Sequence, residues 1–306
     1  MKDETEKIFY DFQKFLEQQE AEPQNEKELE EYVEQFMEAF NKNAETDAGK
    51  SRRKPQTSED YMDLAMEADN AEDALIYAKR ALMKDKDNLD AEVMVAELSA
   101  KSGDEMQKSY RKLIKKAEKK LEAQGLWDEE SFGIYWGIWE TRPYMRLRYN
   151  YIEFLIGQGK RRKAIAECED MLRLCKNDNI GIRYKLMHLY AFYEDEVSAQ
   201  KLYKKYEGYR DTMMLLPFIL LYYRLDDYVH AKKYLKLLCS ANPETEKFFL
   251  DMSDDEIEDS LEEMAEMGAY AFASVEEFLA AISENQYLYM TTSGFAEWIV
   301  QTLKKL

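Results

Sequence analysis

Glycine and proline are scarce in this chain, whose 306 residues include only 11 Gly and 5 Pro. β-Sandwiches and barrels need many such residues in their turns, so the scarcity argues against both folds. Hydrophobic residues make up 45% of the chain, which is enough for a core and argues against a wholly disordered protein. Because strong helix formers such as Glu, Lys, Leu, Ala and Met abound, we predict an all-α fold.

Cysteine and histidine are also rare. The three cysteines, Cys168, Cys175 and Cys239, form no cluster with ligand spacing, and an odd number of thiols suits a reducing compartment. The two histidines, His188 and His230, leave few candidates for a zinc site or a catalytic Ser-His-Asp set. We therefore expect no metal, no cofactor and no enzymatic activity.

Long hydrophobic runs are missing as well. The longest, residues 213–223, has 11 residues and contains Pro217, whereas a membrane-spanning helix needs about 20 apolar residues. The first residues lack the basic and apolar regions of a signal peptide. We expect a soluble, cytoplasmic protein that does not enter a membrane.

Positive charge is in deficit, because 43 Lys and Arg face 62 Asp and Glu and the formal net charge is −19. Nucleic-acid backbones are bound by clustered Lys and Arg, so the balance disfavours a nucleic-acid partner. The acids gather at the two ends. Residues 1–60 carry 17 acids and 9 bases, residues 244–306 carry 15 acids and 3 bases, and the middle carries 30 acids and 31 bases.

The acidic N-terminal region has a helical pattern. Two stretches within residues 1–40 place apolar side chains on one helical face, with a break at Pro23, which predicts a helical hairpin. Residues 41–56 lose this periodicity and are rich in small and charged residues, which is typical of a linker.

The middle of the chain repeats itself. A small residue follows five positions after Gly, Asp or Glu, and apolar residues follow it four and seven positions later. The pattern places Ala74, Lys108 (a weaker copy beginning at Gly103), Ala164, Ala199 and Ala231 at spacings of 34, 56, 35 and 32 residues. Antiparallel helix pairs need a small residue where their backbones cross. We predict four to five helical hairpins over residues 57–243, with an insert at about 120–141.

The C-terminal region supplies two further amphipathic stretches. Phe272, Phe278 and Ile282 share one helical face, and a second stretch covers residues 295–303. A large exposed apolar patch is unusual in a soluble monomer, so residues 213–223 need a cover. We expect residues 244–306 to form acidic capping helices that supply it.

The repeat pattern resembles the tetratricopeptide-repeat family over about residues 57–243. A Trp-Glu-Thr-Arg-Pro-Tyr-Met-Arg block at 139–146, a block running Asp-Asn-Ile-Gly-Ile-Arg at 178–183 and a C-terminal helix with Trp298 resemble a group of bacterial tetratricopeptide proteins over roughly residues 120–306. The resemblance implies a right-handed α-superhelix (an α-solenoid) and an interaction role.

The block at 139–146 allows two interpretations. Pro143 suits the first turn of a helix that runs to about Ile156, with Thr141 as its N-cap. In the structural interpretation, two tryptophans pack under this helix and Arg142 pairs with an acid such as Glu140. In the functional one, Arg142, Arg146 and Arg183 project from the concave face and bind a peptide carboxylate, because guanidinium groups bind carboxylates through two hydrogen bonds.

The first helix of each hairpin is expected to line the concave face, where residues three, four and seven apart lie together. The candidate partner-binding residues are Arg142, Tyr144, Arg146, Tyr149, Glu153, Arg183, Tyr184, His188, Phe192 and Tyr223. The most direct hypothesis is a non-enzymatic adaptor for a protein or peptide. The alternative is a ligand- or peptide-sensing regulator that uses the acidic N-terminal segment as its output arm.

Overall fold

The computed structural model describes residues 32, 33, 35–37, 55–206, 210–252, 256, 257, 259–262 and 270–306. These residues form helices and their connections and include no strand, apart from isolated bridges of Gly133 and Ile134 to Cys175. The predicted all-α fold is confirmed. The chain divides into two compact units, residues 1–56 and 57–306. The predicted hairpin 1–40 and linker 41–56 lie almost wholly outside the described residues, so the account below concerns the second unit.

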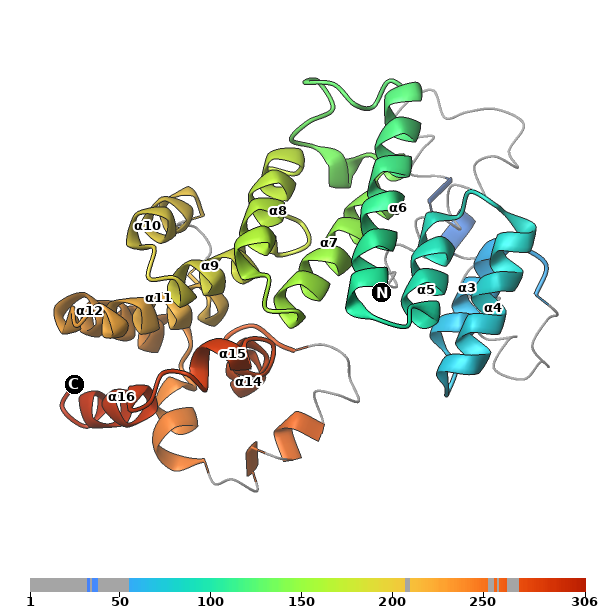
Figure 1. Cartoon of the computed structure of the whole chain (residues 1–306). Coiled ribbons are helices and arrows are strands. Elements are labelled where there is room, and N and C mark those ends of the chain that lie inside the picture. The colour runs from blue at the N-terminus through green and yellow to red at the C-terminus, as the bar shows by residue number, and fades with distance from the viewer. Residues whose placement is uncertain are drawn as a thin grey trace. The chain divides into compact units, whose positions relative to one another are not determined.

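Five helical hairpins follow one another in the described part of this unit (Figure 1). They pair α3 (Ser58–Met66) with α4 (Ala71–Lys84), α5 (Leu89–Ser99) with α6 (Gly103–Ala123), α7 (Arg142–Gly157) with α8 (Arg161–Leu174), α9 (Ile182–Phe192) with α10 (Glu196–Lys205), and α11 (Thr212–Arg224) with α12 (Tyr228–Ala241). The helices of each pair contact each other, and each hairpin contacts the next. Each hairpin therefore buries its apolar faces against the neighbouring hairpins.

Local sequence signals fix where these helices begin and end. The Thr57 hydroxyl accepts from the Asp60 backbone N–H and the Asp60 carboxylate accepts from the Thr57 N–H, so α3 begins with a capping box. Three hairpins turn on a residue in the left-handed region, namely Gly159 with φ 69°, Glu194 with φ 55° and Asp226 with φ 56°. These three residues stand at the predicted turn positions.

The predicted small residues occupy helix crossings in three hairpins. Ala164, Ala199 and Ala231 are fully buried, and each lies four residues after the N-cap of its helix. Close packing of two helices favours a small side chain at such a buried position. This shared position explains the spacing seen in the sequence.

In the second hairpin, the structure differs from the register predicted from the sequence, which placed Lys108 at the position of the small residue. Lys108 is exposed, and Met106 takes the equivalent place, four residues after the N-cap Ser102, where it packs against the core. Gly103 is the first residue of α6 and not a turn residue. The turn lies at residues 100–102, because the Ser102 hydroxyl accepts from the Glu105 backbone N–H and begins the helix there.

The insert joins α6 to α7 through two short 3₁₀ turns, η1 (Tyr135–Gly137) and η2 (Trp139–Thr141). Thr141 is the N-cap residue of α7, as predicted, but its side chain makes no capping hydrogen bond. Its hydroxyl donates to the carbonyl oxygens of Tyr135 and Ile138, the latter at 2.8 Å, and its backbone is already helical. Pro143 lies in the first turn of α7, as predicted.

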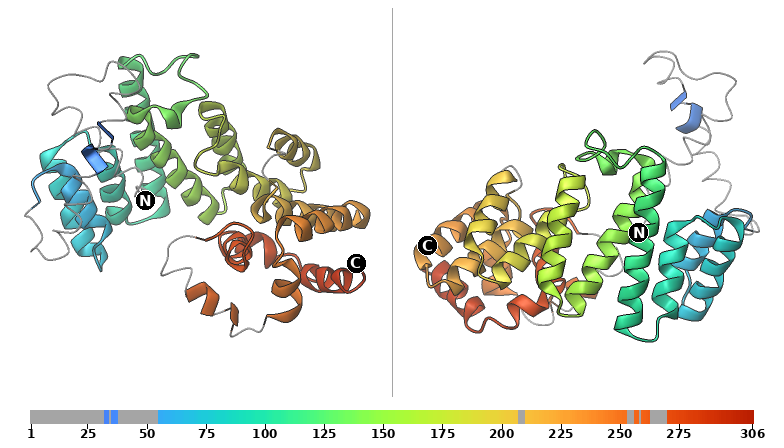
Figure 2. Two further views of the ribbon diagram at one scale, coloured as in Figure 1. Left: turned by 180° about the vertical axis from the view of Figure 1, so that it is seen from behind. Right: turned by 45° about the horizontal axis from the view of Figure 1, so that its top comes forward.

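The C-terminal segment forms a π-helical turn η3 (Lys247–Asp251) and helices α14 (Val275–Ser283), α15 (Gln286–Tyr289) and α16 (Phe295–Leu303). α14 packs on α11 and α15 packs on α9, and both views in Figure 2 show the red C-terminal helices beside the gold ones. Phe278 of α14 is fully buried and stacks on Phe248 at a centroid distance of 4.7 Å. α11 is therefore buried along almost its whole length.

No helix among the described residues is both long enough and apolar enough to cross a membrane.

Candidate functional site

A pocket of about 360 Å³ lies at the N-terminal end of α9, and we call it the α9 pocket. Its walls come from α7, the turn before α9, α9 itself, α11 and the segment around residues 270–284. Three of the predicted partner-binding residues, Tyr149, Arg183 and Tyr184, line it. Repeat helices and the C-terminal segment meet at this place.

The turn before α9 is organised by Asp178, which has a left-handed backbone with φ 50°. Its carboxylate accepts from the backbone N–H groups of Ile182 at 2.7 Å and Arg183 at 2.8 Å, and so satisfies the free amides of the helix N-terminus. Burial raises the pKa of the Asp178 carboxyl, while these amides and the Arg183 guanidinium oppose the rise. The carboxylate is therefore part of the framework of the pocket.

The guanidinium of Arg183 is held on several sides. Its Nη1 donates to Asp178 Oδ2 at 3.0 Å, and its Nη2 donates to the Tyr184 hydroxyl at 2.5 Å. That hydroxyl donates in turn to Asp211 at the start of α11, at 2.6 Å. This hydrogen-bonded network from Asp178 to Asp211 compensates the positive charge of Arg183 with two carboxylates of the chain itself.

A second cation at the pocket is also matched. Lys185 is buried, and its Nζ lies 2.5 Å from Glu153 of α7 and 3.5 Å from Glu284 after α14. Burial alone would lower the pKa of Lys185, but Tyr149 and the two carboxylates raise it above its ordinary value, so the ammonium stays charged. The predicted site residue Glu153 therefore links α7 to α9, and Lys185 links both to the C-terminal segment through Glu284.

The outer wall is apolar and aromatic. Phe272 is 75% exposed, and Tyr270 beside it is half-buried, with burial raising its pKa to about 12. Met213 forms part of the wall and is itself buried. With its cations compensated and its rim aromatic, the α9 pocket is suited to an apolar side chain that brings one or two hydrogen-bonding groups.

Two other predicted arginines have internal partners. Arg146 makes two hydrogen bonds to Asp90 of α5, at 3.0 and 2.6 Å. Arg142 is the first residue of α7. It donates to the Trp136 carbonyl oxygen at 2.9 Å, and its guanidinium lies 5.0 Å from the Trp139 ring centroid. Arg146 therefore links α7 to α5, and Arg142 links α7 to the insert that precedes it.

The remaining predicted residues lie inside the chain or against the C-terminal helices. Tyr144 is buried and donates to Glu118 at 3.2 Å. His188 is buried against Tyr289 of α15. Phe192 makes an edge contact with the Tyr287 ring at 5.6 Å, and Tyr223 contacts the rings of Phe295 and Trp298. Because a buried side chain cannot touch a partner, we leave Tyr144 and His188 out of the proposed site.

Sequence reasoning missed Phe272 as a site residue, since it assigned Phe272 to the apolar face of a capping helix. The predicted start of this helix at Ser274 is confirmed, since Ser274 is the N-cap of α14. Phe272 precedes that cap and is exposed, so it does not belong to the helical face to which the sequence pattern assigned it.

Comparison with models of known protein families finds no match to this chain, and a search of curated proteins finds no relative. Within the described part of the chain, no group of three or more His, Cys, Asp or Glu side chains is placed to hold a metal ion.

Proposed function

We propose that this chain is a non-enzymatic adaptor that binds a protein or peptide on its row of helical hairpins, with the α9 pocket receiving an apolar side chain of the partner. The observation that supports this proposal best is an exposed aromatic residue, Phe272, on the rim of a pocket whose charges are already compensated. Exposed apolar side chains beside a concave site are typical of interaction surfaces.

We also propose that the helical hairpins are tetratricopeptide-like repeats. The shared burial of Ala164, Ala199 and Ala231 and the left-handed turns at equivalent places support tetratricopeptide-like repeats. We propose that they form a right-handed superhelix whose first helices line a concave face. The thiols of Cys168, Cys175 and Cys239 are unpaired, which supports a cytoplasmic location.

A selection of random peptides displayed on phage against the full-length protein tests the binding site. We expect the selected peptides to share an aliphatic or aromatic residue, and their affinity to fall about tenfold or more for Phe272→Glu, because the new carboxylate lies beside Glu284 at the pocket. The measurement is fluorescence anisotropy with labelled peptides.

Val197→Glu is the matched control. Val197 is also strongly exposed, and it lies on α10 away from the α9 pocket lining. Peptides that bind wild type, Phe272→Glu and Val197→Glu equally well would contradict the proposed site.

A further inference from the structure

Helix α6 concentrates positive charge within an acidic chain. Residues 108–120 contain seven bases and one acid, whereas the whole chain has a net charge of −19. The bases are Lys108, Arg111, Lys112, Lys115, Lys116, Lys119 and Lys120, and the acid is Glu118. Such a local reversal of sign creates a field that attracts anionic groups.

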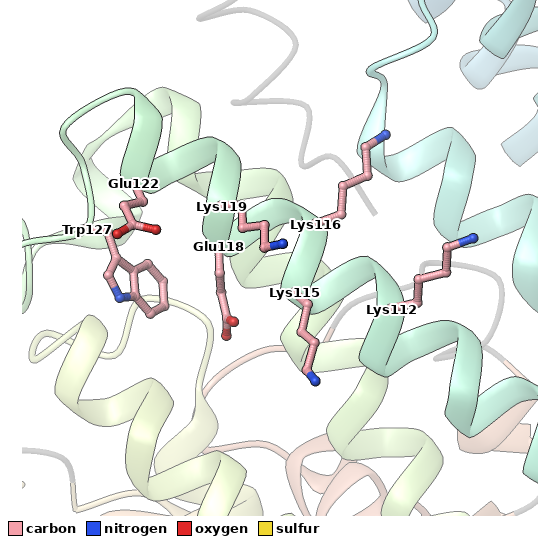
Figure 3. Close-up of a pocket in the computed structure, with 7 residues that line it drawn as sticks. All are labelled: Lys112, Lys115, Lys116, Glu118, Lys119, Glu122 and Trp127. Atoms are coloured by element: carbon pink, nitrogen blue, oxygen red, sulfur yellow. The ribbon is translucent and has the colours of Figure 1, made fainter.

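Part of this helix lines a second pocket, of about 550 Å³. Its lining comprises Lys112, Lys115, Lys116, Glu118, Lys119, Glu122 and Trp127 (Figure 3). Lys112 and Lys116 extend to one side of α6 and Lys115 and Glu118 to the other, while the indole of Trp127 lies near Glu122. We call this surface the α6 basic face.

Three lysines of the α6 basic face can pair with an anionic ligand. Lys116 is engaged, with its Nζ 2.9 Å from Glu92 of α5. Lys112, Lys115 and Lys119 are exposed, and among the described residues no ion pair of theirs is found. All three line the same pocket, with Lys112 on one side of α6 and Lys115 on the other, so a ligand that lies across the surface of the helix can meet them.

Trp127 adds a fixed aromatic surface at one end. Its ring makes edge contacts with Phe132, Tyr135 and Tyr144 at centroid distances of 5.5, 6.3 and 5.7 Å. Because these rings hold the half-buried indole in place, its open part can pack against a side chain without a loss of conformational freedom.

The two carboxylates decide which anion fits. Tyr144 donates to Glu118 at 3.2 Å, which keeps this carboxylate fixed inside the pocket, and Glu122 is exposed next to it. An acidic peptide offers backbone N–H donors to these oxygens between its charged side chains, whereas a nucleic-acid backbone carries phosphate charge and has no N–H donor. A long polyanion would also meet the negative charge of the rest of the chain.

We propose that the α6 basic face binds a short acidic peptide segment of a partner protein, with Asp and Glu side chains on Lys112, Lys115 and Lys119 and an aromatic side chain against Trp127. This site is separate from the α9 pocket and does not depend on the function proposed for it.

The test uses the full-length protein and a labelled synthetic peptide of about ten residues, made of Asp and Glu with one central Phe. We expect its affinity, measured by fluorescence anisotropy, to fall about tenfold or more in the triple variant Lys112→Glu, Lys115→Glu, Lys119→Glu, and to fall in wild type as salt rises from about 50 to 300 mM. Replacing the peptide Phe with Ser should weaken binding to wild type about two- to tenfold.

The matched control is the triple variant Lys79→Glu, Lys84→Glu, Lys86→Glu, which changes the net charge equally at exposed positions in and just after α4. It should bind the peptide nearly as wild type does, as should Phe272→Glu. Circular dichroism checks that every variant is folded. The proposal is overturned if both triple variants bind alike, if single-stranded oligothymidine binds more tightly than the peptide, or if the basic face instead mediates self-association that only the α6 variant loses.

Discussion

Each buried cation of the second unit that lies near the α9 pocket is matched by a carboxylate from another element or turn. Arg183 meets Asp178 at 3.0 Å, and Lys185 meets Glu153 of α7 at 2.5 Å. Removing one member of such a pair leaves the other charge buried without compensation, which costs more than the pair itself contributes. These residues therefore set the positions of helices first, and any role in binding depends on that framework.

His188 offers a test at the residue level, because it is fully buried between α9 and α15. Its Nδ1 lies 2.8 Å from the Tyr184 carbonyl oxygen and its Nε2 lies 3.1 Å from the Tyr289 hydroxyl. Burial lowers the pKa of His188 to about 4. In the unfolded chain the pKa of this histidine is about 6.5. Between that pH and about 4, the imidazole is therefore protonated in the unfolded state and neutral in the folded state.

We therefore expect His188 to make the folded state less stable as pH falls from about 6.5 toward 4, with a loss of about 2 kcal/mol between pH 7.5 and pH 5. Urea unfolding of wild type and His188→Gln at both pH values measures this, because Gln keeps hydrogen-bonding groups and does not titrate. The free energy of unfolding of wild type minus that of His188→Gln should be about 2 kcal/mol lower at pH 5 than at pH 7.5. A constant difference would mean that His188 titrates normally in the folded state.

At the scale of elements, three hairpins place a fully buried alanine at the same position of their second helix. Ala164 of α8 is fully buried, four residues after the N-cap. The corrected register gives α6 a larger residue, Met106, at the same place, and leaves Lys108 on the surface. The hairpins therefore tolerate different side chains there only when neighbouring helices are spaced to suit them.

Substitution with leucine distinguishes these positions. Ala164→Leu inserts three carbon atoms into a filled crossing and should lower the free energy of unfolding by about 1–3 kcal/mol. Lys108→Leu places the same side chain at the exposed position and should change it by no more than about 0.5 kcal/mol. Thermal and urea unfolding measure both. A large loss for Lys108→Leu together with a small one for Ala164→Leu would restore the register predicted from the sequence.

Sequence reasoning succeeded where the determining contacts are local. The turns at Gly159 and Asp226 and the proline in the first turn of α7 depend on residues a few positions apart. The partner of Arg146 could not be predicted, because Asp90 lies 56 residues away and reaches it only through the packing of α5 on α7. The α9 pocket was missed for the same reason, since its walls come from five separate stretches of the chain.

At the scale of the whole second unit, the buried residues form one large cluster and one small one. Most buried residues belong to one cluster that includes α7, α9 and α11 and the C-terminal helices. A separate and smaller cluster in α3, α4 and α5 consists of Met62 and four alanines, Ala65, Ala78, Ala81 and Ala91. Small side chains bury less apolar area, so this end of the row gains less from the hydrophobic effect.

This difference predicts a gradient of local stability along the row of hairpins. In repeat arrays each unit is stabilised chiefly by itself and its neighbours, so a unit with a small core at one end opens without the rest. Native-state hydrogen exchange of residues 57–306 should show faster exchange in α3 and α4 than in α9 and α11. Met62→Ala should increase exchange in α3 and α4 and leave α11 unchanged, whereas Phe278→Ala should increase exchange in α11 and α14. Uniform protection along the row, or an equal response to both variants, would show that the hairpins unfold as one cooperative body.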